Sequence, residues 1–150
     1  PLAGHALYLW HCDREGRYSL YDTSDSNYLR GVGISDADGR IIFTTVFPGC
    51  YAGRWPHLHF EVFVSAGNAG NGSDSLLVSQ FALGDAVCRS VYDADPAYAA
   101  SKANLSGVSV EGDGIFGNNT PEQLAAQTIV VTGDAQSGLR GTVTVGLSRE

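Results

Sequence analysis

Residues 57–64 read HLHFEVFV, and their side chains alternate in chemical character from one position to the next. Successive side chains of a β-strand point to opposite faces, so this alternation predicts a strand. One face of the strand would then hold His57, His59, Glu61 and Phe63, and the other Leu58, Phe60, Val62 and Val64. The first face is suited to chemistry and the second to a hydrophobic core.

Similar short apolar stretches recur along the chain, separated by turns rich in glycine, aspartate and asparagine. This spacing is typical of all-β proteins. It predicts a single domain over residues 1–150, with an all-β sandwich or barrel core of mixed topology, long glycine-rich loops and little helix. The further predicted strands are residues 5–12, 28–35, 40–47, 75–83, 128–133 and 141–148.

Three of the connecting segments have distinct local signals. Gly39 ends the turn DADG and predicts a hairpin between strands 28–35 and 40–47, because glycine readily adopts a left-handed conformation. Residues 93–105 contain Pro96 followed by an alanine-rich body, which predicts a short helix. Residues 66–74, AGNAGNGSD, predict an exposed loop.

The composition excludes some classes of protein. With 150 residues, of which 43% are hydrophobic, the chain has the size and apolar content of one globular domain. Its net charge is −7 and Lys102 is its single lysine, so no basic stripe exists to bind a nucleic-acid backbone. The sequence has no apolar run of about 18 residues, the length that predicts a membrane-spanning helix.

Cys12, Cys50 and Cys88 are too few for a disulfide scaffold and include no CxxC pair, which argues against a thiolate zinc site. The sequence leaves open whether two of the three cysteines form a disulfide and the third is a free thiol. The high content of small polar residues with little lysine favours a secreted, extracellular protein over a cytoplasmic one. Because the chain opens at Pro1 and contains no methionine, we expect it to be a processed product of a longer precursor.

His57 and His59 have the HxH spacing of a metal site. On one face of a strand their Cα atoms would lie roughly 6 to 7 Å apart, so that both rings reach one ion at about 2 Å. A solvated or hydrogen-bonded pair is the alternative, but Tyr51, Arg54 and the distant Tyr18 favour a ferric site. Iron(III) prefers anionic oxygen, and binding it ionises a phenol whose ordinary pKa is about 10. Two phenolates, two neutral histidines and a hydroxide would balance the charge.

The segments around these residues resemble the catalytic core of the intradiol ring-cleavage dioxygenases, the family of catechol and protocatechuate dioxygenases. The matching pieces are residues 1–22, 28–63 and 75–85. Their combined pattern is a tryptophan followed by GxYS, then PGxY, then an arginine, two residues and HxH. The resemblance implies a non-haem Fe(III) cofactor with Tyr51 and His59 as axial ligands, and with Tyr18 and His57 as equatorial ligands beside a hydroxide.

The resemblance also implies an oxidoreductase whose partners are a small catecholic aromatic substrate and O2. Arg54 would lie over the substrate ring and stabilise negative charge, and Gln80 would match a glutamine that supports the site in this family. The catechol would bind iron as a dianion in place of the hydroxide and Tyr51, and the ring would open between its two hydroxyl-bearing carbons to a cis,cis-muconate. Catechol, protocatechuate and hydroxyquinol all fit, lignin-derived aromatics would suit an exported enzyme, and the oligomeric state stays open.

Two other functions fit parts of the sequence. His57, His59 and Glu61 share a face and would form the two-histidine, one-carboxylate site of a cupin-like iron(II) oxygenase. That interpretation gives no role to the two tyrosines or to Arg54. A non-catalytic β-sandwich module that binds carbohydrate or protein through exposed aromatic side chains is the other alternative, and it predicts no bound metal.

The remaining histidines and several aromatic residues are interpreted as structural. His5 and His11 share a predicted strand face with leucines, which is typical of hydrogen-bonded histidines in a core. Tyr8 and Trp10 are predicted to be core residues. Trp55, between an arginine and a proline, is a candidate for contact with the substrate.

Overall fold

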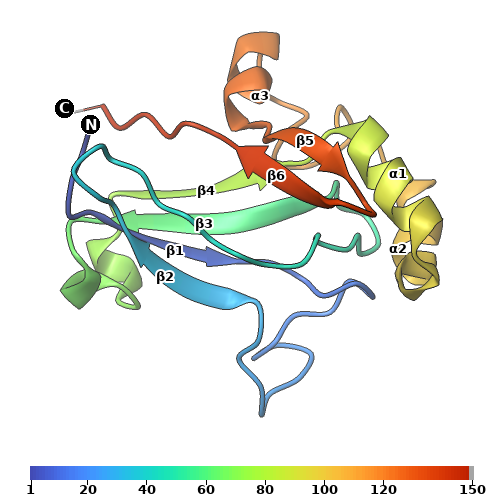
Figure 1. Ribbon diagram of the computed structural model, residues 1–150, viewed down its shortest axis with the longest axis horizontal. Helices are drawn as coiled ribbons and strands as arrows, with labels where there is room; N and C mark the ends of the chain where they lie inside the picture. The colour runs from blue at the N-terminus through green and yellow to red at the C-terminus, as the bar shows by residue number, and fades with distance from the viewer. Residues whose placement is uncertain (149–150) are drawn as a thin grey trace.

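The structure is a computed structural model that describes residues 1–148. Its main element is a four-stranded antiparallel sheet with the strand order β2-β1-β3-β4 (Figure 1). The strands are β1 (Ala6–Trp10), β2 (Arg30–Ile34), β3 (His57–Phe63) and β4 (Leu77–Ala82). A separate two-stranded ribbon consists of β5 (Val130–Asp134) and β6 (Gly138–Thr142), and the bond from the Ile129 N–H to the Ala82 carbonyl ties it to the end of β4.

The helices are short and lie mainly in the second half of the chain. After β4 come α1 (Asp85–Ala94), the single 3-10 turn η3 (Pro96–Tyr98) and α2 (Ala99–Leu105), which gather at one end of the sheet (Figure 1). α3 (Pro121–Gln127) precedes β5, and the single turns η1 (Ala66–Asn68) and η2 (Gly72–Asp74) lie between β3 and β4. No helix in residues 1–148 is long and apolar enough to cross a bilayer.

The hydrophobic core lies against one face of the four-stranded sheet. Leu58, Phe60 and Val62 of β3 are buried there, and the Phe60 ring stacks on that of Phe81 with centroids 4.0 Å apart. Burying a side chain of this size contributes about 1.5–3 kcal/mol. Residues of β5, β6 and the segment 40–47 cover this face. The histidines of β3 therefore project from the opposite face of the sheet.

The prediction of a protein rich in β-structure with little helix is confirmed, but residues 1–148 form no closed barrel. The layer over the sheet is a two-stranded ribbon with irregular segments. The predicted helix at 93–105 is present as η3 and α2, and the loop 66–74 has no buried residue. Helices α1 and α3 were not predicted, and the strand placed at 141–148 is instead β6 at residues 138–142.

The prediction of a strand at 40–47 is wrong. The turn before it forms, with φ of +74° at Gly39 and a bond of 3.0 Å from the Asp36 N–H to the Arg40 carbonyl. Ile41 then packs its side chain against Gly33 of β2, where a Cβ atom would lie 2.3 Å from Ile41 Cγ2. The segment thus covers the face of the sheet, which the small glycines allow, and does not pair with its edge as a hairpin would.

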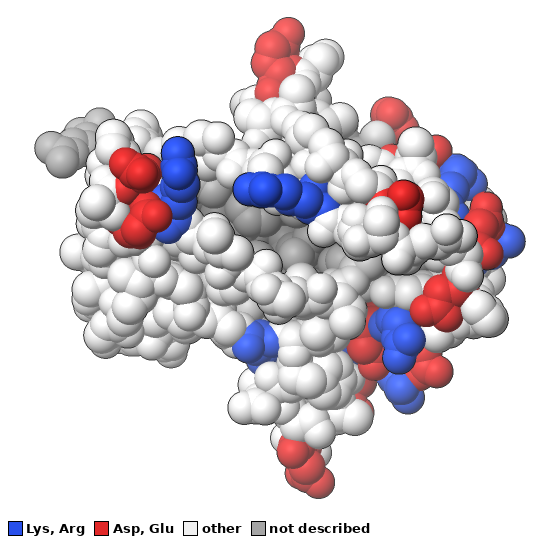
Figure 2. Space-filling model, in the orientation of Figure 1, with Lys and Arg blue, Asp and Glu red and all other residues white. Residues whose placement is uncertain are grey.

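The three cysteines are all buried and free, so the disulfide left open by the sequence does not form. Most charged side chains lie on the surface, although Asp113 is buried. On the face shown in Figure 2 positive and negative groups are interspersed, mostly near its periphery.

Candidate metal centre

The structure brings together the four side chains that the sequence assigns to a metal. His57 and His59 come from β3, Tyr18 from the loop after β1, and Tyr51 from the loop before β3. The Tyr18 hydroxyl lies 3.4 Å from His57 Nε2 and 3.1 Å from His59 Nε2. The Tyr51 hydroxyl lies 3.3 Å from His57 Nε2, and the two Nε2 atoms are 3.1 Å apart.

This spacing fits a single metal ion. Two donors that each bind an ion at about 2 Å lie roughly 2.8 Å apart at a right angle and roughly 3.5 Å apart at 120°. The separations of 3.1 to 3.4 Å within the cluster fall inside that range. The donor set contains two oxygens that can ionise and two imidazole nitrogens, which suits a hard, highly charged ion such as iron(III).

The histidines are held in the form that binds metals. His57 Nδ1 lies 2.5 Å from the Trp55 carbonyl oxygen, which only accepts, so Nδ1 carries the proton and Nε2 offers its lone pair to the cluster. Burial lowers the pKa of His57 to about 4 despite that hydrogen bond. Burial, followed by the neighbouring His57, lowers the pKa of His59 to about 3. Both imidazoles are therefore neutral at pH 7.

The phenols are protonated when no metal is present. Burial raises the pKa of Tyr18 and of Tyr51 above the ordinary value, and the positive charge of Arg54 opposes that rise at both. A trivalent cation at the cluster would lower the pKa of both tyrosines, because it stabilises the phenolate directly. Metal binding at this site should therefore release protons.

Helix α2 fixes the two loops that position the tyrosines. The hydroxyl of Ser101, fully buried, accepts a bond of 2.8 Å from the Cys50 N–H and donates one of 2.7 Å to the Arg14 carbonyl. Asn104 donates to the Cys50 carbonyl at 2.9 Å. Gly49 allows the loops to approach closely, since a Cβ atom there would lie 2.2 Å from the Asp13 carbonyl oxygen. The second half of the chain thus sets the distance between Tyr18 and Tyr51.

Arg54 and Gln80, both singled out from the sequence, lie at the edge of the cluster. The β3–β4 register places Gln80 opposite His59. Arg54 Nη1 lies 3.4 Å from the Tyr51 hydroxyl, and Nη2 donates to Gln80 Oε1 at 2.7 Å. Arg54 Nε donates to the Asp113 carboxylate at 2.9 Å, a partner that the sequence did not reveal. The only local signal for Asp113 is the dipeptide Asp-Gly, which predicts a turn and no ion pair.

The Asp113 carboxylate predicts a pH dependence of stability. Burial raises its pKa, but hydrogen bonds from Arg54 and from the backbone outweigh this and lower the value from 3.8 to about 2. A lowered folded-state pKa stabilises the protein above pH 4, and the stabilisation is lost as the pH falls toward 2. The difference in unfolding free energy between wild type and Asp113→Asn should shrink by about 2 kcal/mol over this interval in urea titrations. A constant difference would contradict the assignment.

The alternative iron(II) site is not supported. Residues 1–148 contain no group of three His, Cys, Asp or Glu side chains placed to hold a metal ion, so Glu61 does not complete a site with His57 and His59. His11 is a hydrogen-bonded structural histidine, as predicted, with Nε2 2.8 Å from the Thr45 hydroxyl and Nδ1 2.8 Å from the Cys12 carbonyl.

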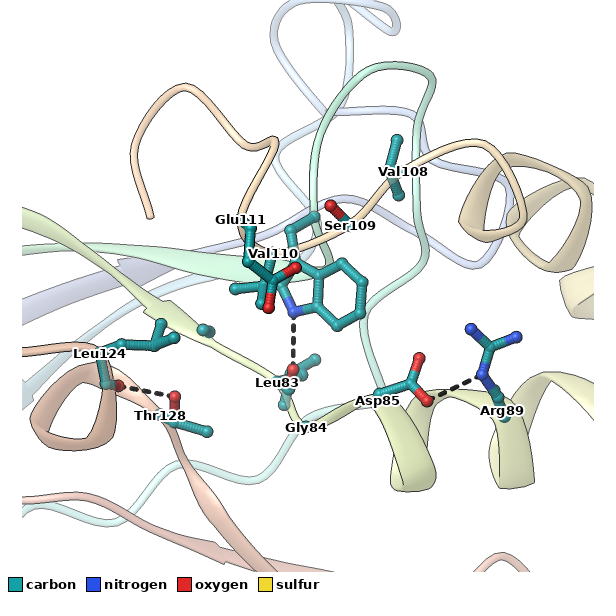
Figure 3. A pocket seen from close by; sticks show the side chains of 12 residues that line it. Leu83, Gly84, Asp85, Arg89, Val108, Ser109, Val110, Glu111, Leu124 and Thr128 are labelled. Atoms are coloured by element: carbon teal, nitrogen blue, oxygen red, sulfur yellow. Dashed lines mark hydrogen bonds and ion pairs between the residues drawn. The ribbon is translucent and has the colours of Figure 1, made fainter. Parts of the chain in front are cut away.

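Two tryptophans lie elsewhere than the sequence suggested. Trp10 is only partly buried, on the histidine face of the sheet, and its ring stacks on His59 with centroids 4.9 Å apart, so its assignment to the core is wrong. Trp55 is 5% exposed and donates its indole N–H to the Leu83 carbonyl. It lines a separate groove of about 380 Å³ together with Leu83, Val110 and Leu124 (Figure 3). None of the four cluster side chains lines that groove.

Comparisons with known proteins relate the chain to dioxygenases. Residues 1–71 match the family model described as Dioxygenase. An intradiol ring-cleavage dioxygenase from Tetranychus urticae has a TM-score of 0.77 and 23% identity, covering 98% of this chain and 72% of that one. The dioxygenase domain of a dioxygenase carbohydrate-binding protein fusion from Streptomyces sp. SirexAA-E has a TM-score of 0.58 and 24% identity, covering 94% of this chain and 66% of that one. No curated protein gives a sequence match.

The resemblance to the intradiol ring-cleavage dioxygenases is thereby confirmed. The family model covers the segments that contain Tyr18, Tyr51, His57 and His59, and nearly the whole chain shares the fold of a solved member. These findings support a dioxygenase enzyme.

Proposed function

We propose that the chain is a non-haem iron(III) dioxygenase that cleaves catechol-type aromatics with O2 between the two hydroxyl-bearing carbons. The products would be of the cis,cis-muconate type. The observation that carries the proposal is a cluster of two phenol oxygens and two neutral imidazole nitrogens, in which each phenol oxygen lies 3.1 to 3.4 Å from at least one imidazole nitrogen, with a guanidinium beside them.

The four cluster residues, Tyr18, Tyr51, His57 and His59, would hold the ion. Ferric iron would supply Lewis acidity and an electron-accepting centre for a bound catecholate. The hydrogen bond between His57 Nδ1 and the Trp55 carbonyl keeps the other ring nitrogen, Nε2, directed at the cluster. Because both histidines are neutral at pH 7, a metal ion would not have to displace protons from their ligating nitrogens.

Proton transfer and charge stabilisation would come from Tyr51 and Arg54. The Tyr51 oxygen, as a phenolate, is placed to accept a proton from a substrate hydroxyl. Arg54, 3.4 Å from that oxygen, would stabilise negative charge on the substrate while Gln80 holds its other edge. Trp10, stacked on His59, would provide an aromatic surface beside the cluster. Catechol, protocatechuate and hydroxyquinol are the candidate substrates.

The colour of the iron-loaded protein tests the metal site. Phenolate bound to iron(III) absorbs visible light by charge transfer, so a wine-red solution should form and bleach when iron is removed. Glu61→Gln is the control and should leave the band unchanged, because Glu61 lies outside the cluster. A colourless iron(II) protein, or one that binds no iron, would contradict the proposal.

Product analysis tests the reaction itself. With catechol and O2, the iron-loaded protein should consume one O2 per ring and form cis,cis-muconate. A yellow semialdehyde would show that the ring is cut outside the two hydroxyl groups, and the intradiol assignment would then be wrong.

A further inference from the structure

The guanidinium of Arg54 is held on three sides. Nη1 faces the Tyr51 hydroxyl at 3.4 Å, and Nη2 donates to Gln80 at 2.7 Å. Nε and Nη2 both reach the Asp113 carboxylate, at 2.9 and 3.3 Å. Only the first of these contacts is directed at the metal centre. The others fix the plane of the guanidinium relative to that centre.

Asp113 is a buried carboxylate with five hydrogen bonds. Its side chain is 0% exposed, and besides two bonds from Arg54 it accepts the backbone N–H groups of Trp55, Ile115 and Phe116 at 2.8 to 3.1 Å. A buried charge is stable only when it is paired and hydrogen-bonded in this way. Asp113 lies between α2 and α3, outside residues 1–71 that match the family model.

We infer that Asp113 is a positioning residue for the reaction, which fixes Arg54 so that its Nη1 edge faces Tyr51 and the substrate position. This inference rests on the proposed function. An arginine bonded to a carboxylate through two nitrogens has a defined plane as well as a defined position. Arg54 is 22% exposed, so without Asp113 only the Gln80 amide and the longer contact with the Tyr51 hydroxyl would hold the guanidinium.

A purely structural role is the competing explanation. Three of the five donors to Asp113 are backbone groups, so the carboxylate also organises the loop that contains Ile115 and Phe116. If Asp113 acts only on the loop, its substitution should lower kcat/KM by the same factor whether or not Arg54 is present. A residue that acts through Arg54 would lose its effect when the guanidinium is gone.

A double-mutant cycle distinguishes the two roles. In iron-loaded protein, Asp113→Asn and Arg54→Gln should each lower kcat/KM for catechol about 10- to 100-fold, and the double variant should be no slower than Arg54→Gln alone. If the fold-loss in kcat/KM of the double variant equals the product of the two single losses, the inference is overturned. Asp85→Asn is the matched control. It removes an exposed aspartate–arginine ion pair, in which Arg89 Nε lies 2.8 Å from Asp85 Oδ2, and it should leave kcat/KM unchanged.

A second measurement needs neither iron nor turnover. In the metal-free protein, the Arg54 Nε–H resonance in ¹⁵N spectra, assigned by its loss in Arg54→Gln, should exchange with solvent slowly in wild type. It should exchange at least about 10-fold faster in Asp113→Asn, because its buried acceptor is altered. Equal exchange in both proteins would overturn the inference. If wild type cleaves no catechol, the proposed function fails while this result still decides whether Asp113 fixes Arg54.

Circular dichroism establishes whether each variant is folded before either measurement. If Asp113→Asn does not fold, Asp113→Glu replaces it, since this variant keeps the charge and moves the carboxylate by one methylene. A folded Asp113→Glu protein should show faster Arg54 Nε–H exchange. It should also show a lower kcat/KM, and this loss should disappear in an Arg54→Gln background. Wild-type values for both quantities would overturn the inference.

Discussion

Replacing Tyr18 by phenylalanine is expected to remove the metal centre and to lower turnover of catechol by at least about 100-fold. Changes one step removed from a metal ligand typically cost 10- to 100-fold, and this change deletes a donor itself. The Tyr18 oxygen is the cluster atom that contacts both histidine nitrogens, at 3.4 and 3.1 Å. The ring keeps its edge contacts with Tyr51 and His59, so the fold should survive.

Iron content, visible absorption and kcat measured on one preparation test this prediction. Tyr18→Phe should contain less than one iron per chain and lose or shift its visible band. Tyr21→Phe is the matched control, because Tyr21 is 73% exposed and meets Tyr18 only edge-on, with centroids 6.2 Å apart. The control should keep full iron and activity. A Tyr18→Phe protein with the wild-type band would show that this phenol is not a ligand.

The part of the site that the sequence predicted is the part that local geometry determines. Alternation along β3 places His57 and His59 on one face whatever the rest of the chain does. The short spacing from Tyr51 and Arg54 to that strand limits how far either can lie from the histidines. Local geometry does not place Tyr18 beside the histidines, because β1 and its loop are joined to β3 by long-range pairing. Its assignment as a ligand rests on the family resemblance.

The missed features depend on packing between distant segments. Asp113 follows Arg54 by 59 residues and belongs to no motif, so only the folded chain reveals their ion pair. The segment 40–47 has residues suited to a strand. Because Gly31 and Gly33 have no side chains, the side chains of this segment pack on the face of β2 instead of pairing with its edge. The sequence does contain a signal for helix α3, because Thr120 and Gln123 form a capping box and a proline lies in the first turn.

Substituting Gly49 by alanine should have the largest effect on stability, and it should disrupt the metal centre without touching a ligand. The new Cβ atom would lie 2.2 Å from the Asp13 carbonyl oxygen and 2.7 Å from the Ser101 hydroxyl. Both neighbours are fixed, since Ser101 is buried and bonded to the loops of Tyr18 and Tyr51. The clash should cost about 3 kcal/mol, the upper end of the usual range for overpacking.

Urea unfolding of the metal-free protein measures this cost, and iron titration measures its effect on the site. Because the alanine pushes apart the two loops that hold Tyr18 and Tyr51, iron affinity should fall about 10-fold or more even where the variant is fully folded. Gly72→Ala makes the same chemical change where no atom lies within 4 Å of the new Cβ, and should shift the unfolding free energy by no more than about 0.5 kcal/mol. If Gly49→Ala matched that control in both stability and iron affinity, the two tyrosine loops could separate without cost, and the close approach at Gly49 would not set the geometry of the site.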